Sequence, residues 1–347
     1  MDDDTTAAVI ALRRIAFLLE RALESTYRVK SFRGAAATLQ DLPDGEVRRR
    51  VDQDSLQELP GVGATTAAVI TEAIDGGVPT YLAELEARVG GPVSTGGDEL
   101  LVTLRGDLHT HSDWSDGGSP VAEMAETARD LGHSYVALTD HSPRLTVAHG
   151  LSPERLREQL TLVAEVGKDL APFRLLSGIE CDINLDGTLD QTDELLGELD
   201  VVVASVHSEL KMPREDMTRR MVAAIANPHT DVLGHCTGRN VSPRGRRGKP
   251  RPESAFDAEV VFEACRRFDV AVEINCRPER LDPPRRLLRL AVETGCLFAI
   301  DTDAHAPGQL DWRAYGAARA EECDVPPDRI VTTWPVDRLL EWTGRNG

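Results

Sequence analysis

No long uninterrupted apolar segment occurs in the sequence, although 41% of its 347 residues are apolar. The absence argues against a membrane span, while the apolar content is ample for a large core. The N-terminus, Met-Asp-Asp-Asp, lacks the basic and apolar regions of a signal peptide. These absences together predict a cytoplasmic protein.

The sequence also lacks any CxxC pair. In a chain of this length, scattered cysteines predict reduced and mostly buried thiols, which we interpret as small core residues. The six are Cys181, Cys236, Cys265, Cys276, Cys296 and Cys323.

An excess of basic residues is missing as well, because 58 acidic residues against 39 basic ones give a formal charge of −19. This charge opposes indiscriminate binding to nucleic acid but leaves room for a local basic groove. The strongest basic cluster is Arg244-Gly-Arg-Arg-Gly-Lys-Pro-Arg251. It is either a solvated loop or a flexible lip that contacts a nucleic-acid backbone.

Residues 1–90 predict a compact helical domain. One helix is predicted by apolar residues at helical spacing, and a second is expected over Ser31–Leu39. Ser55 and Glu58 have the spacing of a capping box, and Gly61-Val-Gly63 predicts a tight turn that opens a helix of small residues. The apolar positions of the first helix are Val9, Leu12, Ile15, Ala16, Leu19 and Leu23.

The turn at Gly61–Thr65 exposes backbone N–H groups at a helix N-terminus, where a DNA phosphate can bind. Gly61, Val62, Gly63 and Thr65 are therefore the candidate DNA-binding residues, although such a turn can also merely join two packed helices. The arrangement resembles the helix-hairpin-helix in the N-terminal domain of family X DNA polymerases. Two features depart from that family. No lysine occurs before the end of the helix, which argues against lyase chemistry, and the 10 basic and 15 acidic residues of 1–90 leave a charge of −5.

A Gly-rich linker is predicted over residues 91–99. Residues 100–347 are predicted to form a second, larger domain after it. In the family X polymerases the catalytic palm and thumb would follow the helical domain at this point. Because the linker leaves no room for them, we do not expect polymerase activity.

From residue 100 onward, short apolar runs alternate with helical stretches, and polar residues follow each run. Strict alternation predicts a parallel sheet, and chemistry at many strand ends favours a (β/α) barrel over a doubly wound open sheet. The apolar run Leu100–Leu104 is expected to lead into the first strand as part of it. The seven strand candidates are Leu104–His111, Ser134–Thr139, Arg174–Ile179, Asp200–Val206, Thr230–Gly234, Val270–Ile274 and Leu297–Ile300. Helices are expected over Pro120–Leu131, Pro153–Leu170, Met217–Asn227, Ser254–Phe268, Pro284–Thr294 and Val336–Trp342.

Histidines and carboxylates gather at these strand ends. His109 and His111 stand two apart, so their rings share one face of an extended strand. Imidazole and carboxylate groups together bind Zn, Mn or Fe. The nine candidate metal ligands are His109, His111, Asp116, His141, Glu180, His207, His235, Asp303 and His305.

Residues 104–318 resemble a PHP (polymerase and histidinol phosphatase) domain, most of all the one attached to bacterial family X polymerases. The resemblance rests on Asp107-Leu-His-Thr-His-Ser, Leu138-Thr-Asp-His141, Gly178-Ile-Glu-Cys-Asp-Ile183, Ala204-Ser-Val-His207, Gly234-His-Cys-Thr-Gly-Arg239, Glu273-Ile-Asn275, Arg277-Pro-Glu-Arg-Leu-Asp282 and Thr302-Asp-Ala-His305.

This resemblance implies an irregular seven-stranded (β/α) barrel, the PHP fold, with three divalent metal ions. It implies that one ion is held by His109, His111, Glu180 and Asp303. Glu180 would bridge to a second ion held by His207 and His235, and Asp116, His141 and His305 would hold the third.

Two positions depart from the family pattern. Asp116 stands where some members have histidine, which favours Mn or Fe over Zn. Cys236 stands where proline is usual, so it could perturb the loop or compete as a soft ligand.

Clustered divalent cations would turn a shared water into hydroxide and hold phosphate oxygens, with Asp303 and Arg239 as the catalytic residues. Arg239 is expected to contact phosphate in a bidentate way. Lys211, Asn275, Arg277 and Arg280 are further substrate-binding candidates, and each could equally be a solvated surface or capping group.

Three functions remain open from the sequence. The first is a phosphoesterase acting on DNA ends or gaps as a 3′→5′ exonuclease or 3′-phosphatase, with apurinic-site cleavage as a further reaction. The second is a small-molecule phosphatase resembling histidinol phosphatase. The third is a non-catalytic DNA-binding or repair partner with structural metals. The acidic N-terminal stretch favours the second, whereas the hairpin and the basic cluster favour the first.

Overall fold

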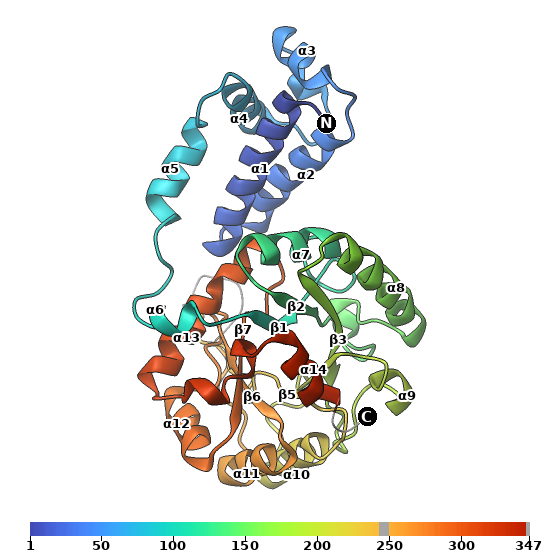
Figure 1. The fold of residues 1–347 in the computed structure, drawn as a ribbon, viewed down its shortest axis with the longest axis vertical. Helices are drawn as coiled ribbons and strands as arrows, with labels where there is room; N and C mark the ends of the chain where they lie inside the picture. The colour runs from blue at the N-terminus through green and yellow to red at the C-terminus, as the bar shows by residue number, and fades with distance from the viewer. Residues whose placement is uncertain (243–249, 345–347) are drawn as a thin grey trace. The chain divides into compact units, whose positions relative to one another are not determined.

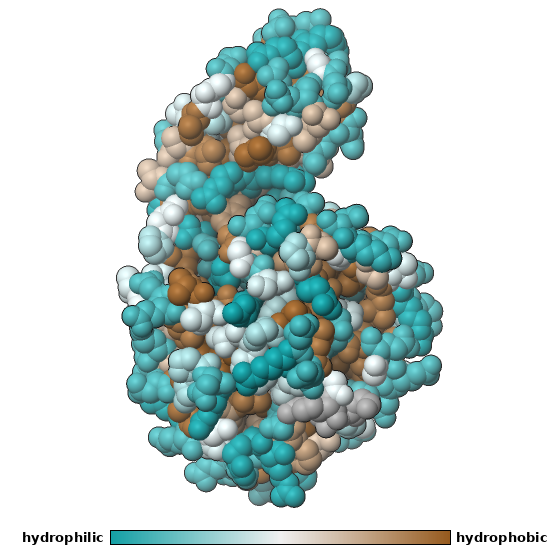
Figure 2. Space-filling view, in the orientation of Figure 1, coloured by the Kyte–Doolittle hydropathy of each residue, from teal (hydrophilic) through white to brown (hydrophobic). Residues whose placement is uncertain are grey.

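The computed structural model describes residues 1–242 and 250–344. The chain forms two compact units, Met1–Pro92 and Val93–Gly347 (Figure 1). Of the basic cluster Arg244–Arg251, only Pro250 and Arg251 belong to the described residues. No helix in the described ranges is long and apolar enough to cross a membrane. On the face shown in Figure 2, hydrophilic residues cover most of the larger unit.

The first unit is helical, with α1 packed against α2 and α4. The α1 helix begins where the Asp2 side chain accepts a hydrogen bond from the Thr5 N–H at 2.7 Å, and it buries Leu12, Ile15 and Leu19 completely. The helices are α1 (Asp3–Arg21), α2 (Thr26–Gln40), α3 (Glu46–Asp52), α4 (Ala64–Ile74) and α5 (Thr80–Val89), with a 3-10 turn η1 at Leu56–Glu58.

Two local predictions for this unit are wrong. The second helix begins at Thr26 instead of Ser31, because its first turn buries no side chain and so shows no apolar periodicity. The Ser55 side chain makes no capping bond, and η1 ends after Glu58. Leu59 precedes Pro60, which disfavours helical backbone at Leu59.

The second unit is a barrel of seven parallel strands in chain order, as predicted. It closes where Thr110 pairs with Ala304, and the His111 N–H donates to the Ala304 carbonyl at 2.8 Å. The strands are β1 (Gly106–Thr110), β2 (Tyr135–Leu138), β3 (Arg174–Asp182), β4 (Val201–Ser205), β5 (Val232–Leu233), β6 (Ala271–Asn275) and β7 (Leu297–Asp301).

Helices surround the barrel (Figure 1). The helical stretches expected from the sequence are all present, with ends shifted by up to four residues. The helices are α7 (Val121–Asp130), α8 (Pro153–Asp169), α9 (Asp193–Leu196), α10 (Arg214–Ile225), α11 (Ala258–Phe268), α12 (Arg285–Thr294), α13 (Arg313–Glu322) and α14 (Val336–Thr343).

The run Leu100–Leu104 is not part of a strand. Asp98–Leu101 forms the short helix α6, which packs against α13. Gly97 precedes α6 with φ +75°, and its N–H donates to Glu321 at 2.7 Å. Acidic residues at the start of a helix are favourable, so Asp98 and Glu99 support this outcome.

The barrel core lies toward the N-terminal ends of the strands. There the C-terminal helix α14 packs Leu339 and Trp342 against strand residues such as Leu108 and Val201. These apolar side chains close this end of the barrel. The opposite end, where the strands finish, is left for polar side chains.

Candidate metal centre and hairpin site

The nine predicted ligands meet at the C-terminal ends of the strands. Alternate residues of a strand point to one face, so Glu180 and Asp182 of β3 turn toward the barrel interior together. β3 continues through Asp182, three residues beyond the predicted end, so Glu180 lies within the strand and not after it. The extension follows from pairing of Cys181 with Ala204 of β4.

Four overlapping groups of side chains are close enough to hold a metal ion. In each group the ligand atoms lie within 4.8 Å of one another. The groups are His111, Asp116, His141 and His305; His109, His111 and Asp303; His109, Glu180 and His235; and His141, Glu180 and His207. All nine predicted ligands belong to at least one group, but their metal-binding role stays a prediction.

Glu180 lies at the centre of these groups. One of its carboxylate oxygens is 2.8 Å from His141 Nδ1 and 3.3 Å from His109 Nε2. The other is 2.8 Å from His235 Nε2 and 3.1 Å from His207 Nε2. A carboxylate shared by four imidazoles has the geometry of a bridging ligand.

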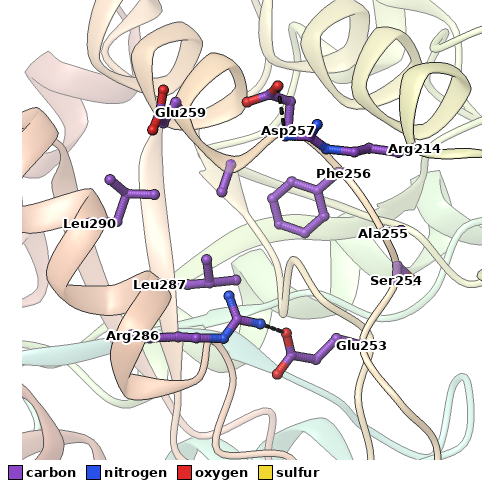
Figure 3. A pocket seen from close by; sticks show the side chains of 11 residues that line it. Arg214, Glu253, Ser254, Ala255, Phe256, Asp257, Glu259, Arg286, Leu287 and Leu290 are labelled. Carbon is purple, nitrogen blue, oxygen red and sulfur yellow. Dashed lines mark hydrogen bonds and ion pairs between the residues drawn. The ribbon is translucent and has the colours of Figure 1, made fainter.

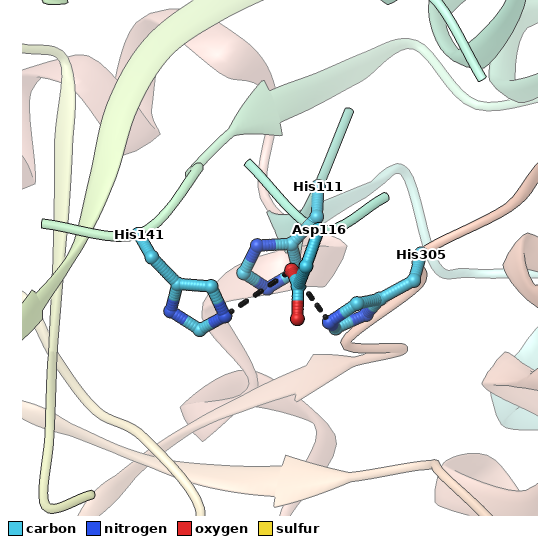
Figure 4. Close-up of side chains that lie close together, drawn as sticks. All are labelled: His111, Asp116, His141 and His305. Carbon is cyan, nitrogen blue, oxygen red and sulfur yellow. Dashed lines mark ion pairs between the residues drawn. The ribbon is translucent and has the colours of Figure 1, made fainter. Parts of the chain in front are cut away.

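Asp116 lies nearer the solvent, with 37% of its side chain exposed. One carboxylate oxygen of Asp116 is 3.4 Å from His141 Nε2 and 3.3 Å from His305 Nε2 (Figure 4). Figure 4 also shows the His111 ring beside this carboxylate. A cation at this position would be the one most open to solvent.

Several histidine ring nitrogens at the centre are buried in a way that suits binding of a cation. Among the described residues, both ring nitrogens of His111 and His207, and Nε2 of His109, are buried without a well-directed hydrogen bond, although carboxylate oxygens lie 3.1 to 3.6 Å from four of these five nitrogens. Buried polar atoms without partners are costly. Nitrogen and oxygen donors in this number suit Zn, Mn or Fe.

The charges at the centre are strongly coupled. Burial alone would raise the pKa of Glu180, but His207, His109 and His141 hold the pKa of this carboxyl well below its usual value. Burial opposes protonation of His141, yet Glu180 and Asp116 raise its pKa to about 10. A metal ion requires the deprotonated imidazole, so metal and proton compete for this site.

Asp303 carries a local strain. Its φ is +53°, in the left-handed region that favours glycine, and such strained residues concentrate at functional sites. Burial would raise the pKa of its carboxyl, but Arg277 and Arg280 lower this pKa well below its usual value. The carboxylate is therefore ionised and ready to bind a cation.

A second layer of carboxylates orients the histidines, and none of these residues was assigned a role from the sequence. Glu273 lies 2.5 Å from His109 Nδ1 and accepts a hydrogen bond from the backbone N–H of His235. Asp182 accepts from the backbone N–H of His207 at 3.2 Å. Strand alternation in the sequence could have identified both carboxylates, because Glu273 lies on the same strand face as Asn275, and Asp182 on the same face as Glu180.

Substitution of Glu273 by glutamine is expected to weaken metal binding about 10- to 100-fold, because the change removes the charge that orients His109. Titration of the metal-free protein with Mn or Zn measures the affinity. Glu263→Gln on the exposed face of α11 is the matched control. An unchanged affinity in E273Q would show that Glu273 has no part in the centre.

Some of the predicted substrate-binding residues lie at the metal centre and others do not. Arg277 Nη1 is 2.8 Å from His305 Nδ1, and the Asn275 side chain donates to Asp303 at 3.2 Å, so both lie at the centre. Arg239 donates instead to the backbone carbonyls of Arg280 and Leu281. Its proposed phosphate contact stays a prediction.

Arg280 is closer to the centre than the sequence indicated, because its Nε is 3.1 Å from the Asp303 carboxylate. Lys211 is exposed in the loop after β4, outside the four ligand groups. Cys236 is buried, and its sulfur lies 3.7 Å from a carboxylate oxygen of Asp282. This contact places the thiol against Asp282 and outside the four ligand groups.

The hairpin has the predicted turn. Gly61 has φ +75°, a conformation that L side chains rarely adopt, and Val62 is buried. The Gly63 N–H donates to Thr66 Oγ1 at 2.9 Å, so the side chain of the third helical residue satisfies the N-cap amide of α4. Gly63 and Thr65 are exposed, and within the described part of the chain no acceptor contacts the Thr65 amide.

Comparison with known proteins supports this architecture. Residues 5–79 match the helix-hairpin-helix domain and residues 107–275 match the PHP domain. DNA polymerase/3′-5′ exonuclease PolX of Bacillus subtilis (strain 168) is 38% identical over 250 residues, which are 71% of this chain and 42% of that protein. The chain thus spans less than half the length of this relative.

Shorter relatives match a similar share of the chain. Probable phosphatase YcdX of Escherichia coli (strain K12) is 28% identical over 259 residues, which are 70% of this chain and 94% of that protein. A crystal structure of histidinol phosphate phosphatase from Lactococcus lactis, complexed with Zn, L-histidinol and phosphate, is 21% identical with a TM-score of 0.44, covering 63% of this chain and 94% of that one. The chain therefore carries a helix-hairpin-helix domain followed by a PHP domain, and its relatives support a metal-dependent phosphoesterase.

Proposed function

We propose that this phosphoesterase hydrolyses phosphate esters at DNA ends, as a 3′→5′ exonuclease or a 3′-phosphatase. The observation that carries the proposal is that one chain holds both the nine-residue ligand cluster and an open helix-hairpin-helix. A relative whose match covers 71% of this chain is named a DNA polymerase/3′-5′ exonuclease.

The hairpin supplies a means of reaching DNA despite the acidic charge of the first unit. The exposed start of α4 presents backbone N–H groups at the positive end of the helix dipole. These groups bind a phosphate without any basic side chain. In contrast, the Thr80 N–H at the start of α5 already donates to Glu72 at 2.5 Å.

At the metal centre, the nine ligands would hold divalent cations, which when bound supply Lewis acidity and a water of lowered pKa. Arg277 and Arg280 lie beside Asp303 and would neutralise the charge of a phosphate. The second-layer carboxylates keep the histidine rings oriented. The chain therefore contributes orientation and charge neutralisation, which an in-line attack on phosphorus requires.

The test is hydrolysis of a 3′-end-labelled gapped duplex in Mn by full-length Thr65→Glu. A carboxylate at this position repels phosphate but favours the helix dipole, so the fold is retained. We expect a marked rise in KM for DNA. Thr80→Glu is the matched control, because it places the same charge at a helix start that is already occupied.

The result that would overturn the hairpin role is equal KM for DNA in T65E, T80E and the unchanged protein. Failure of all three to release nucleotide or 3′-phosphate from DNA would overturn the proposed function itself.

The second candidate is a small-molecule phosphatase. It is favoured by relatives named probable phosphatases, of which the chain covers up to 94%, and by the acidic first unit. Under this alternative, histidinol phosphate or another small phosphomonoester would be hydrolysed while labelled DNA would not.

A further inference from the structure

A cavity of about 410 Å³ lies between the loop that follows β4 and the segment that begins at Arg251. Leu210, Met212 and Pro252 line it with apolar surface. Two cationic groups, Lys211 and Arg251, and two carboxylates, Glu209 and Glu253, complete the charged part of the lining. Its volume falls in the range of sites that hold small molecules, which are mostly apolar with a few placed polar groups.

Both walls of the cavity are attached to loops that carry candidate ligands. Leu210 and Lys211 follow His207 in the loop after β4. Gly238 follows His235, and it packs so closely on Leu210 that an added Cβ would lie 2.8 Å from the leucine Cδ2. The cavity therefore adjoins the Glu180–His207–His235 side of the metal centre.

Positive charge continues from the metal centre to the cavity. Arg251 Nε donates to the Gly238 carbonyl at 2.6 Å, and its pKa is lowered by burial and by repulsion from Arg280. Arg280 in turn contacts Asp303 at 3.1 Å. The bond to Gly238 holds the Arg251 guanidinium at the loop that follows His235, on the side where the apolar cavity lies.

A neighbouring cavity of about 540 Å³ lacks this character (Figure 3). Its two arginines are already paired, Arg214 with Asp257 at 2.8 Å and Arg286 with Glu253. Glu259 adds a further negative charge to its lining. In the first cavity Glu253 is already paired with Arg286, so Lys211 and Arg251 stand against Glu209 alone, and an anion is favoured there over the second cavity.

The loop after β4, which forms one wall of the first cavity, is held in place by Arg220 of α10. The buried guanidinium of Arg220 donates to the Ser208 carbonyl at 2.8 Å and to the Ser208 hydroxyl at 3.1 Å. It also lies 3.8 Å from the Met212 sulfur. The loop is thus preformed, which reduces the entropy lost when a ligand binds.

We propose that this cavity is the subsite for the nucleoside whose 5′-phosphate lies at the metal centre. Its apolar walls contact the faces of the base, while Lys211 and Arg251 face the phosphodiester. This inference rests on the exonuclease form of the proposed function, because only that reaction places the 5′-phosphate of a terminal nucleoside at the metal centre.

Two chromogenic diesters test the subsite in the full-length protein with Mn. Thymidine 5′-(p-nitrophenyl phosphate) and methyl p-nitrophenyl phosphate have the same leaving group and the same bond to be broken. They differ only in the second ester group, which is a nucleoside in the first compound and a methyl group in the second. We expect the intact protein to prefer the thymidine ester in kcat/KM. In Leu210→Gln this preference should fall about tenfold, and in Ala255→Leu, which adds bulk to the lining, it should also fall.

Leu185→Gln, a matched change at an exposed leucine outside the cavity, should keep the preference. Hydrolysis of both esters with no preference, or with a preference that L210Q and A255L retain, would overturn the subsite and leave the proposed function standing. Hydrolysis of neither ester together with inactivity on DNA would overturn the proposed function and the subsite with it.

Discussion

Glu180→Gln is expected to lower kcat by about a thousandfold or more and to reduce the metal content of the purified protein. The carboxylate of Glu180 faces His109, His141, His207 and His235, so its loss removes the negative charge that two ligand groups share. Metal catalysis is worth several kcal/mol, and each 1.36 kcal/mol is about tenfold in rate.

Elemental analysis and turnover of a phosphate ester measure the two effects on one preparation. Glutamine preserves the size of the side chain, and Glu194→Gln on exposed α9 is the matched control. Full metal content together with full activity in E180Q would contradict the metal centre described above.

Arg220→Met is expected to lower the free energy of unfolding of the barrel unit by about 3 to 5 kcal/mol. Arg220 is 1% exposed on α10 and donates to the carbonyls of Ile183, Asn184 and Ser208. The substitution leaves these carbonyls without their charged donor. Since these residues follow the strand ends of Glu180 and His207, metal affinity should also fall.

Urea unfolding followed by tryptophan fluorescence measures the stability, because all four tryptophans lie in the barrel unit. Arg219→Met, an adjacent change at a side chain that is 72% exposed, is the matched control. Arg220→Lys keeps the charge but not the fork of donors, so partial recovery is expected. Equal unfolding midpoints for R220M and R219M would contradict a clamping role.

Much of the barrel followed from the sequence because its signals are local. Each strand is a short apolar run, and the polar residue that ends it reports the C-terminal edge of the sheet. The prediction of secondary structure failed where contacts between distant segments determine which element forms. Leu100–Leu104 has the composition of a strand, but α6 forms there because Gly97 and Asp98 start a helix that packs on α13.

The layer around the ligands needed the structure. Glu273 belongs to a strand that was predicted and Asp182 lies three residues beyond the predicted end of another, yet only closure of the barrel shows that they face His109 and His207. Arg220 belongs to none of the motifs found in the sequence. Its role depends on two loops separated from it by 12 and 37 residues.

The sequence by itself determined the alternation of strands and helices, the nine candidate ligands and the hairpin turn, because each depends on residue type and short spacing. Only the tertiary structure decided that Arg239 turns to the backbone while Arg280 faces Asp303. It also decided which loops line the cavity beside His207. The physical reason is that side-chain direction in a loop is set by packing against distant segments, and one-dimensional spacing carries no record of that packing.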